Sequence, residues 1–296
     1  MPDIKIRLIR TQKILSPTQI SLADYVINPY RGCEFGCLYC YAQENKNSRN
    51  NGFFNTLGVK INAAEVLKRQ LYYIRPKRVL LGSTTECFQY QESRYKITEQ
   101  ILHVLNAQQV PYTILTKSHL IKEYLPLIRE HKKNKVYFTL NCASDETVRL
   151  LEKKSPSVSE RLIAIKAVLQ QDIALRVHIG PFIPYLSSLK DILRLLPENV
   201  QEVDIELYHH KMGNFDALLK AIEHTCGTQL KNTLASLYAR QENYLRFAQE
   251  LQNEITHIAS QDKRIFFYII PDFNKFYSPA IGYEQPITTA GYSKKI

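Results

Sequence analysis

The chain has 296 residues, a length that suits one large domain or two small ones and is ample to bury a core. Hydrophobic residues make up 45% and charged residues 23%, which excludes a disulfide-stapled miniprotein, a fibrous repeat and a mostly disordered chain. The 39 basic and 28 acidic residues give a formal net charge of +11. This charge suits an anionic partner such as nucleic acid, and equally a surface that is merely basic and solvated.

No segment of the sequence predicts an association with a membrane. The longest strongly apolar stretch, 265–270, is far too short to cross a bilayer, and the first ten residues mix charge into every few positions. We therefore expect neither a signal peptide nor a membrane span, and a soluble, cytoplasmic protein.

From about residue 24, short β-rich runs alternate with amphipathic stretches of helical period, which is typical of a parallel sheet with crossover helices. The runs predict six strands, at 25–29, 78–81, 112–115, 136–140, 175–179 and 202–207. Helices are expected between them. Three of these helices have a capping residue followed three positions later by an acidic residue, the caps being Asn62, Ser157 and Ser188.

Beyond Leu207 this alternation fades. A helix is predicted near 215–223, and apolar residues then recur near the helical period from Leu230 to Ile258. A late strand, 264–270, precedes a tail that contains proline and tyrosine. We expect three parts: an N-terminal lead-in (1–23), a main α/β domain (24–210) and a mostly helical C-terminal extension (211–296) packed on it.

Three of the six cysteines, Cys33, Cys37 and Cys40, follow the first predicted strand with the spacing C-x3-C-x2-C. Thiolates select iron–sulfur clusters or zinc, and parallel barrels place their chemistry at the C-terminal ends of strands. A closed zinc site needs four ligands, whereas no fourth Cys or His lies nearby in the sequence. Three ligands on a four-iron cluster would leave one iron open. The spacing therefore favours such a cluster over a zinc knuckle or three unliganded thiols.

This motif, with an aromatic residue before its last cysteine, resembles the signature of radical SAM enzymes. The resemblance covers about residues 12–210 and is similar in detail to the spore photoproduct lyase-like subgroup, also labelled DNA repair photolyase-like. The stretches that carry it are 28–33, 40–42, 82–86, 115–118, 155–162 and 180–185. The resemblance implies a partial TIM barrel of six βα units, which agrees with the six strands predicted independently.

The resemblance also implies the cofactors. A 4Fe–4S cluster would be held by Cys33, Cys37 and Cys40, and S-adenosylmethionine would bind its open iron. An electron from a donor such as flavodoxin or ferredoxin would then split the sulfonium bond, and the 5′-deoxyadenosyl radical would abstract hydrogen from a substrate.

Five further residues are expected, by the same resemblance, to contact the cofactor. Thr85 would offer its hydroxyl, Lys117 would meet the carboxylate, Thr139 would lie near the ribose, and Tyr39 near the adenine; Glu86 would contact cofactor or substrate. Other readings stay open, namely a hydroxyl that caps a helix for Thr85, a surface lysine for Lys117, and a residue that merely opens a helix for Glu86.

The sequence departs from the subgroup at one position. Spore photoproduct lyases use a cysteine just after the second strand to return hydrogen to the product radical, and Ser83 stands there in this chain. A serine hydroxyl is a far poorer hydrogen-atom donor. Cys87 and Cys142 are the candidates to replace it, although an isolated cysteine is commonly a small buried hydrophobe.

We therefore expect a radical SAM enzyme whose chemistry is not that of a typical spore photoproduct lyase, with nucleic acid as the first candidate substrate. Two alternatives remain open. One keeps the radical chemistry but acts on a peptide, a protein or a small metabolite, and the other is a non-enzymatic interaction module that binds zinc.

Overall fold

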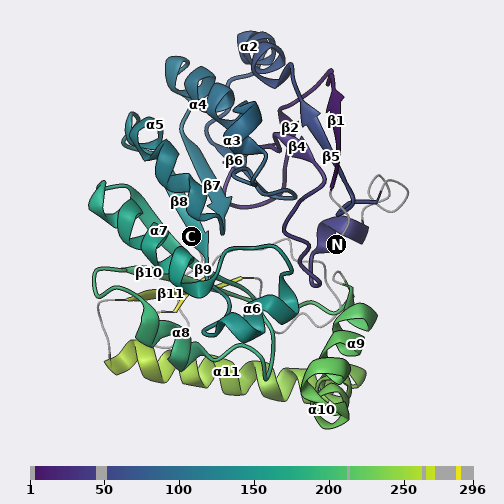
Figure 1. The fold of residues 1–296 in the computed structure, drawn as a ribbon. Helices are drawn as coiled ribbons and strands as arrows, with labels where there is room; N and C mark the ends of the chain where they lie inside the picture. The colour runs from purple at the N-terminus through teal and green to yellow at the C-terminus, as the bar shows by residue number, and fades with distance from the viewer. Residues whose placement is uncertain (1–3, 45–51, 212–213, 262–264, 271–284, 288–296) are drawn as a thin grey trace.

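The computed structural model describes residues 4–44, 52–211, 214–261, 265–270 and 285–287 (Figure 1). Their strands form two sheets. The larger has the order β12-β11-β10-β9-β8-β7-β6-β3-β2, and the smaller the order β1-β5-β4. The strands of the larger sheet are β2 (Ser16–Pro17), β3 (Tyr25–Ile27), β6 (Val79–Leu81), β7 (Tyr112–Thr116), β8 (Lys135–Thr139), β9 (Ala174–Phe182), β10 (Glu202–Leu207), β11 (Phe266–Ile270) and β12 (Gln285–Ile287). Those of the smaller are β1 (Lys5–Ile9), β4 (Tyr30–Arg31) and β5 (Thr56–Lys60).

The helices connect these strands and continue beyond them. They are α2 (Ala63–Tyr73), α3 (Glu92–Tyr95), α4 (Ile97–Ala107), α5 (Leu125–Arg129), α6 (Asp145–Leu151), α7 (Val158–Gln170), α8 (Leu189–Leu195), α9 (Phe215–Cys226), α10 (Thr228–Ala239) and α11 (Gln241–Gln261), with short 3₁₀ helices at Tyr41–Glu44 and His119–Tyr124. In Figure 1, α2, α4, α5 and α7 lie on the outer side of the strands, and α11 runs along the bottom of the view, with α9 and α10 at one end of it. Across the described residues, no helix combines the length and the apolar character that spanning a bilayer requires.

The six predicted strands are present as β3 and β6 to β10, and each is parallel to its neighbour. The late strand is present as well, over Phe266–Ile270, whereas Arg264 falls outside the described residues. It pairs in parallel with β10. The parallel arrangement therefore does not stop at Leu207, as the fading sequence pattern suggested, and the C-terminal extension supplies a strand as well as helices.

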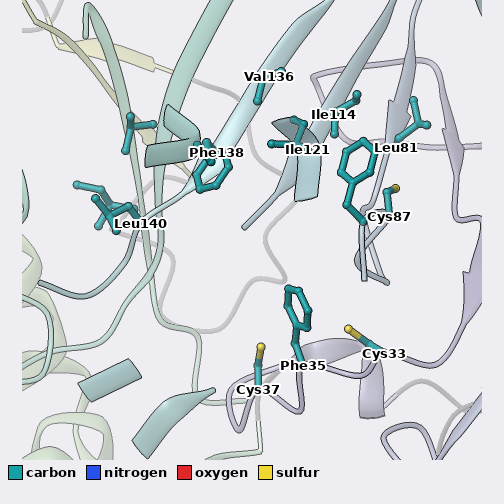
Figure 2. Close-up of a cluster of buried hydrophobic side chains, with 14 of the residues drawn as sticks. Cys33, Phe35, Cys37, Leu81, Cys87, Ile114, Ile121, Val136, Phe138 and Leu140 are labelled. Atoms are coloured by element: carbon teal, nitrogen blue, oxygen red, sulfur yellow. The ribbon is translucent and has the colours of Figure 1, made fainter. Parts of the chain in front are cut away.

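The parallel strands carry the core. Every residue of β6 is buried, as are most of β7 and β8, because a parallel sheet with helices packed on it has little surface in contact with water. Figure 2 shows Leu81 of β6, Ile114 of β7, and Val136 and Phe138 of β8 above the loop that carries Phe35. These apolar runs are what the sequence pattern detected.

Two of the three predicted helix caps are confirmed. Ser157 and Glu160 form a reciprocal capping box at the start of α7, and Ser188 accepts a hydrogen bond from the Asp191 amide at the start of α8. Asn62 precedes α2 but does not cap it. Its side-chain amide instead bonds the backbone of Thr11, at 2.8 Å and 2.9 Å, and so ties the lead-in to the rest of the fold.

Candidate functional site

A cavity of about 410 Å³ opens where the parallel strands end. Residues that follow or close β6, β7, β8, β9 and β10 all line it, together with the loop of residues 33–40, called here the cysteine loop. Its lining includes the three cysteines of this loop and a set of mostly polar residues at the strand ends: Cys33, Cys37, Tyr39, Cys40, Ser83, Thr85, Glu86, Lys117, Thr139, His178, Gly180, Asp204 and Glu206. The structure thus gathers the three cysteines and all five expected cofactor residues at one place.

Two glycines shape the cysteine loop. Gly32 has φ +91°, and a Cβ at this position would lie 2.2 Å from the carbonyl oxygen of Thr56, so only glycine fits there. Gly36 has φ +64°, a left-handed conformation that side chains other than glycine rarely adopt. The loop therefore turns tightly and presents Cys33, Phe35 and Cys37 toward the strands (Figure 2).

The segment between α6 and α7 anchors this loop. The Leu38 amide donates to the Leu151 carbonyl at 2.8 Å, and the Lys154 amide donates to the Phe35 carbonyl at 3.1 Å. An isolated β-bridge joins Cys37 to the same segment. The positions of the thiols are therefore set by backbone hydrogen bonds as well as by packing.

All three thiols are shielded from water to a large degree. Cys33 and Cys37 are buried and Cys40 is partly buried. Burial raises the pKa of Cys37 to about 12, although the nearby Lys117 ammonium favours the thiolate. Metal binding removes the thiol proton and satisfies the buried sulfur, so this donor set suits a soft metal centre.

Among the described residues, no three His, Cys, Asp or Glu side chains converge as one single metal ion requires. A zinc knuckle is built by such convergence on one ion. In a four-iron cluster held by three cysteines, each thiolate binds a different iron and one iron stays open, so the three ligands need not meet at one point. Two buried thiols and one partly buried thiol from a single loop fit such a cluster.

A buried ion-pair network joins Lys117 to the cysteine loop. The Lys117 Nζ lies 2.8 Å from Glu152 Oε1, donates to the Tyr39 hydroxyl at 2.5 Å and lies 3.6 Å from Cys37 Sγ. Arg161 pairs with the other carboxylate oxygen of Glu152, and the side chains of Glu152 and Arg161 are fully buried. Burial alone would raise the pKa of Glu152, but Arg161 and Lys117 lower it well below its usual range. Lys117 is thus a largely buried, paired cation and not a surface lysine.

Thr85 and Glu86 follow β6 and play different parts. The Thr85 hydroxyl is buried, and no hydrogen-bond partner for it is present in the described part of the chain. It caps no helix, so it is available to a ligand.

The Glu86 carboxylate accepts hydrogen bonds from the Thr116 hydroxyl at 2.7 Å and from the amides of Phe88 at 3.0 Å and Lys117 at 3.1 Å. Glu86 therefore links the ends of β6 and β7, and it does not open a helix, since α3 begins at Glu92.

Cys87 and Cys142 are fully buried, but neither lines the cavity. Ser83 does line it, and its hydroxyl accepts a hydrogen bond from the Asn28 side chain at 3.2 Å. The structure therefore does not bring either candidate cysteine to the position from which it would replace a cysteine at residue 83.

The sequence analysis missed several residues of the site. Asn28, at the end of β3, accepts hydrogen bonds from the amides of Thr84 and Thr85 and so fixes the loop after β6. Glu152 holds the Lys117 ammonium in place through an ion pair. The two carboxylates of β10, Asp204 and Glu206, were missed as well, and they form a third group with His178. Asp204 and Glu206 alternate along a predicted strand, which is the signal that could have revealed them.

These features agree with the comparisons to known proteins. The chain belongs to the radical SAM superfamily, whose family model matches residues 27–196. Radical SAM enzymes use a 4Fe–4S cluster and S-adenosylmethionine, so membership of the superfamily implies both cofactors for this chain.

Two relatives by sequence carry the description "uncharacterized protein". An uncharacterized protein of Methanocaldococcus jannaschii is 30% identical over 191 residues, which cover 64% of this chain and 72% of the relative. An uncharacterized protein of Mycobacterium tuberculosis is 32% identical over 173 residues, which cover 55% of this chain and 51% of the relative. The chain thus spans about half the length of the mycobacterial relative.

Solved structures with a similar fold include spore photoproduct lyase and Streptococcus suis SuiB. A spore photoproduct lyase mutant matches with a TM-score of 0.55 at 20% identity, covering 68% of this chain and 60% of that one. Another mutant of that enzyme, with bound AdoMet and dinucleoside spore photoproduct, gives 0.54 at 18% identity, covering 74% and 65%. Streptococcus suis SuiB bound to its precursor peptide SuiA gives 0.56 at 16% identity, covering 85% and 50%. At these identities the likeness shows the fold alone.

Proposed function

We propose that Cys33, Cys37 and Cys40 hold the 4Fe–4S cluster and that S-adenosylmethionine binds beside it in the cavity. Bound together, the two cofactors supply reductive cleavage of the sulfonium bond and a 5′-deoxyadenosyl radical that abstracts hydrogen from the substrate. The observation that carries this proposal is that three thiols of one loop, the Lys117 ammonium and the unpaired Thr85 hydroxyl all line a single cavity.

The remaining residues bind and orient the cofactor in this proposal. An ammonium has three donors, and those of Lys117 serve Tyr39, Glu152 and, at the longer distance of 3.6 Å, Cys37 Sγ. The third donor is the one that would meet the carboxylate of the cofactor once Cys37 binds iron. Thr85 donates a hydrogen bond to the cofactor from its free hydroxyl, and Thr139, at the end of β8, lies near the ribose. Tyr39 contacts the adenine with its ring, because its hydroxyl is bound to Lys117. Glu86 shapes the loops through the three hydrogen bonds that it accepts.

We also propose that β3 and β6 to β10 form the six βα units of a partial TIM barrel. The parallel pairing of all six strands and the single cavity at their C-terminal ends support this arrangement. A small electron-transfer protein such as flavodoxin or ferredoxin supplies the electron.

The charges of the cavity bear on the substrate. Among the described residues, its ionisable lining includes the carboxylates of Glu86, Asp204 and Glu206 and one lysine or arginine, Lys117. The densest basic run, residues 132–135, lies where β8 begins, at the opposite end of the strand from the cavity. A phosphate backbone would find no stabilisation in this cavity. For the group that reacts there, we therefore favour a peptide, a protein or a small metabolite over nucleic acid.

The experiment is anaerobic reconstitution with iron and sulfide, followed by metal analysis and quantification of 5′-deoxyadenosine formed from S-adenosylmethionine under dithionite. The wild type should bind about four irons and negligible zinc per chain and form 5′-deoxyadenosine. Cys37→Ala should lose both properties. Cys226→Ala is the matched control, because Cys226 is exposed and lies at the end of α9. Stoichiometric zinc with no iron in the wild type would overturn the proposal and restore the zinc-binding module.

A further inference from the structure

Three ionisable side chains on β9 and β10 line the cavity and have no part in the proposed cofactor site. They are His178, Asp204 and Glu206. Asp204 and Glu206 are two residues apart on one strand, and alternate residues of a strand face the same side. The strand register places Asp204 directly opposite His178 on the neighbouring strand. The pairing of the strands, and not a flexible loop, thus brings the three together.

The imidazole of His178 bridges the two carboxylates. Its Nδ1 lies 2.6 Å from Asp204 Oδ2, and its Nε2 lies 3.5 Å from Glu206 Oε2. Asp204 is completely buried, and its other oxygen, Oδ1, accepts no hydrogen bond within the described part of the chain. The Glu206 side chain keeps 35% of its surface exposed. One carboxylate therefore lies deep in the cavity with an acceptor to spare, and the other is open to solvent.

Gly180 makes room for this arrangement. A Cβ at residue 180 would lie 1.9 Å from Nε2 of His178 and 2.2 Å from its Cε1, so the imidazole occupies the space that a side chain would take. The ring lies against the backbone of its own strand, where only glycine leaves that space free.

The charges of the group do not balance. Burial disfavours the imidazolium, but Asp204 and Glu206 outweigh it and raise the pKa of His178 above its ordinary value. With the histidine protonated, two carboxylates face one cation. Lys117, the other nearby cation, pairs with Glu152, and Arg176 of β9 pairs with Glu202. Burial also raises the pKa of Glu206, and a cationic ligand beside it would favour its ionised form, so such a ligand would be stabilised by the two carboxylates.

We propose that Asp204 and Glu206, linked through His178, form a subsite that binds a protonated amine or guanidinium group of the substrate. This inference rests on the proposed function, because the same cavity holds the cofactors. The free Oδ1 of the buried Asp204 accepts a hydrogen bond from an N–H group of the ligand. Glu206, which is partly exposed, pairs with the positive charge of the ligand. Such a group belongs to a lysine or arginine side chain of a peptide and to small amine metabolites alike.

The test is calorimetric binding of agmatine, which carries both groups, to the reconstituted protein and to the protein without a cluster. Removing one charged contact by Glu206→Gln should weaken binding about tenfold or more. Asp204→Asn should weaken agmatine binding by a similar factor. If this variant of a buried residue does not fold, Glu206→Gln alone tests the proposal. Glu254→Gln, at an exposed position of α11, should bind agmatine as the wild type does. A short lysine- and arginine-containing peptide, compared with agmatine, distinguishes the two sources of the group.

Three results would overturn the inference: equal affinity of wild type and Glu206→Gln, no agmatine binding by the wild type in either form, or equal binding of an uncharged alcohol of the same length. Loss of S-adenosylmethionine affinity in step with agmatine affinity would assign the carboxylates to the cofactor's own ammonium, which also contradicts it. Failure to assemble a cluster contradicts the proposed function alone, because agmatine binding to the cluster-free protein still decides the subsite.

Discussion

Glu152 holds together two parts of the site that come from distant regions of the chain. Its carboxylate pairs with Lys117 and Arg161, and all three side chains are largely or wholly buried. Removing one member of a buried charge group leaves the others without compensation, which costs far more than the loss of a surface pair.

We therefore expect Glu152→Gln to lower the free energy of unfolding by about 3–5 kcal/mol, because Lys117 and Arg161 would remain as two buried cations. Urea unfolding of the cluster-free protein measures this. Glu160→Gln is the matched control, since Glu160 is an exposed capping-box residue whose loss should cost only about 1 kcal/mol. Equal losses in the two variants would show that the buried network does not stabilise the fold.

The pair of His178 and Asp204 should make stability depend on pH. Burial and Lys117, the residue after β7, oppose the imidazolium, whereas Asp204 and Glu206 of β10 attract it, and the net effect raises the pKa of His178 above its ordinary value. A raised pKa means that the stabilisation is fully present below about pH 6.5 and is lost as the pH rises through the folded-state value. Each unit of the shift corresponds to about 1.4 kcal/mol.

Unfolding experiments over pH 5–9, roughly the range in which histidine titrates, should therefore show the wild type losing stability relative to Asp204→Asn as the pH rises. The variant lacks the attracting charge, so its stability should change less over the same range. A difference between the two proteins that grows with pH would contradict the assignment.

How far these residues could be predicted depends on their separation in the sequence. The three cysteines Cys33, Cys37 and Cys40 lie close together in the sequence, so their spacing alone predicted a shared site. Lys117 came from the resemblance, but its partner Glu152 lies 35 residues further on, and nothing local indicates their contact. His178 and Asp204 are 26 residues apart and meet only because β9 and β10 pair. Pairing of strands decides such contacts, and a single sequence does not encode it in any short pattern.

At the scale of elements, the long parallel strands were predictable and the small sheet was not. Buried parallel strands are continuous apolar runs, which composition reveals directly. The strands β1 and β5 pair in register although they are about fifty residues apart, and most of β1 is exposed, so neither shows a clear pattern. Asn62 illustrates the same limit, because Thr11 of the lead-in takes the side chain that would otherwise cap α2.

The strand β11 offers a direct test of the extended sheet. Its neighbouring residues Phe266 and Phe267 face opposite sides, and their exposed fractions are 62% and 1%. Phe267→Ala should cost about 3–5 kcal/mol through the cavity that it leaves, whereas Phe266→Ala should change stability by no more than about 0.5 kcal/mol. Thermal unfolding of both variants provides the comparison, and similar behaviour of the two would mean that β11 does not pack as part of the core.

At the scale of the whole molecule, the net charge of +11 and the acidic cavity point to different partners. A basic exterior binds nucleic acid without sequence preference, and such binding weakens steeply as salt rises. The cavity, by contrast, carries Glu86, Asp204 and Glu206 against Lys117.

We therefore expect DNA or RNA to bind weakly and to leave the rate of 5′-deoxyadenosine formation unchanged. Fluorescence anisotropy at about 50 to 200 mM salt, run beside the cleavage assay, checks both statements. Stimulation of cleavage by either nucleic acid would restore it as the leading substrate.

The anchoring of the cysteine loop bears on the order of events during synthesis of the protein. The three cysteines leave the ribosome before their anchor, because Tyr39 and Glu152, which join the loop to that anchor, are 113 residues apart. Until residue 154 has emerged, the loop lacks the backbone partners that fix its thiols. Iron and sulfide delivered to the nascent chain before that point would meet an unformed loop, so cluster insertion belongs after residue 154 has been translated. The cysteines that bind the cluster are therefore translated well before the segment that holds them in place.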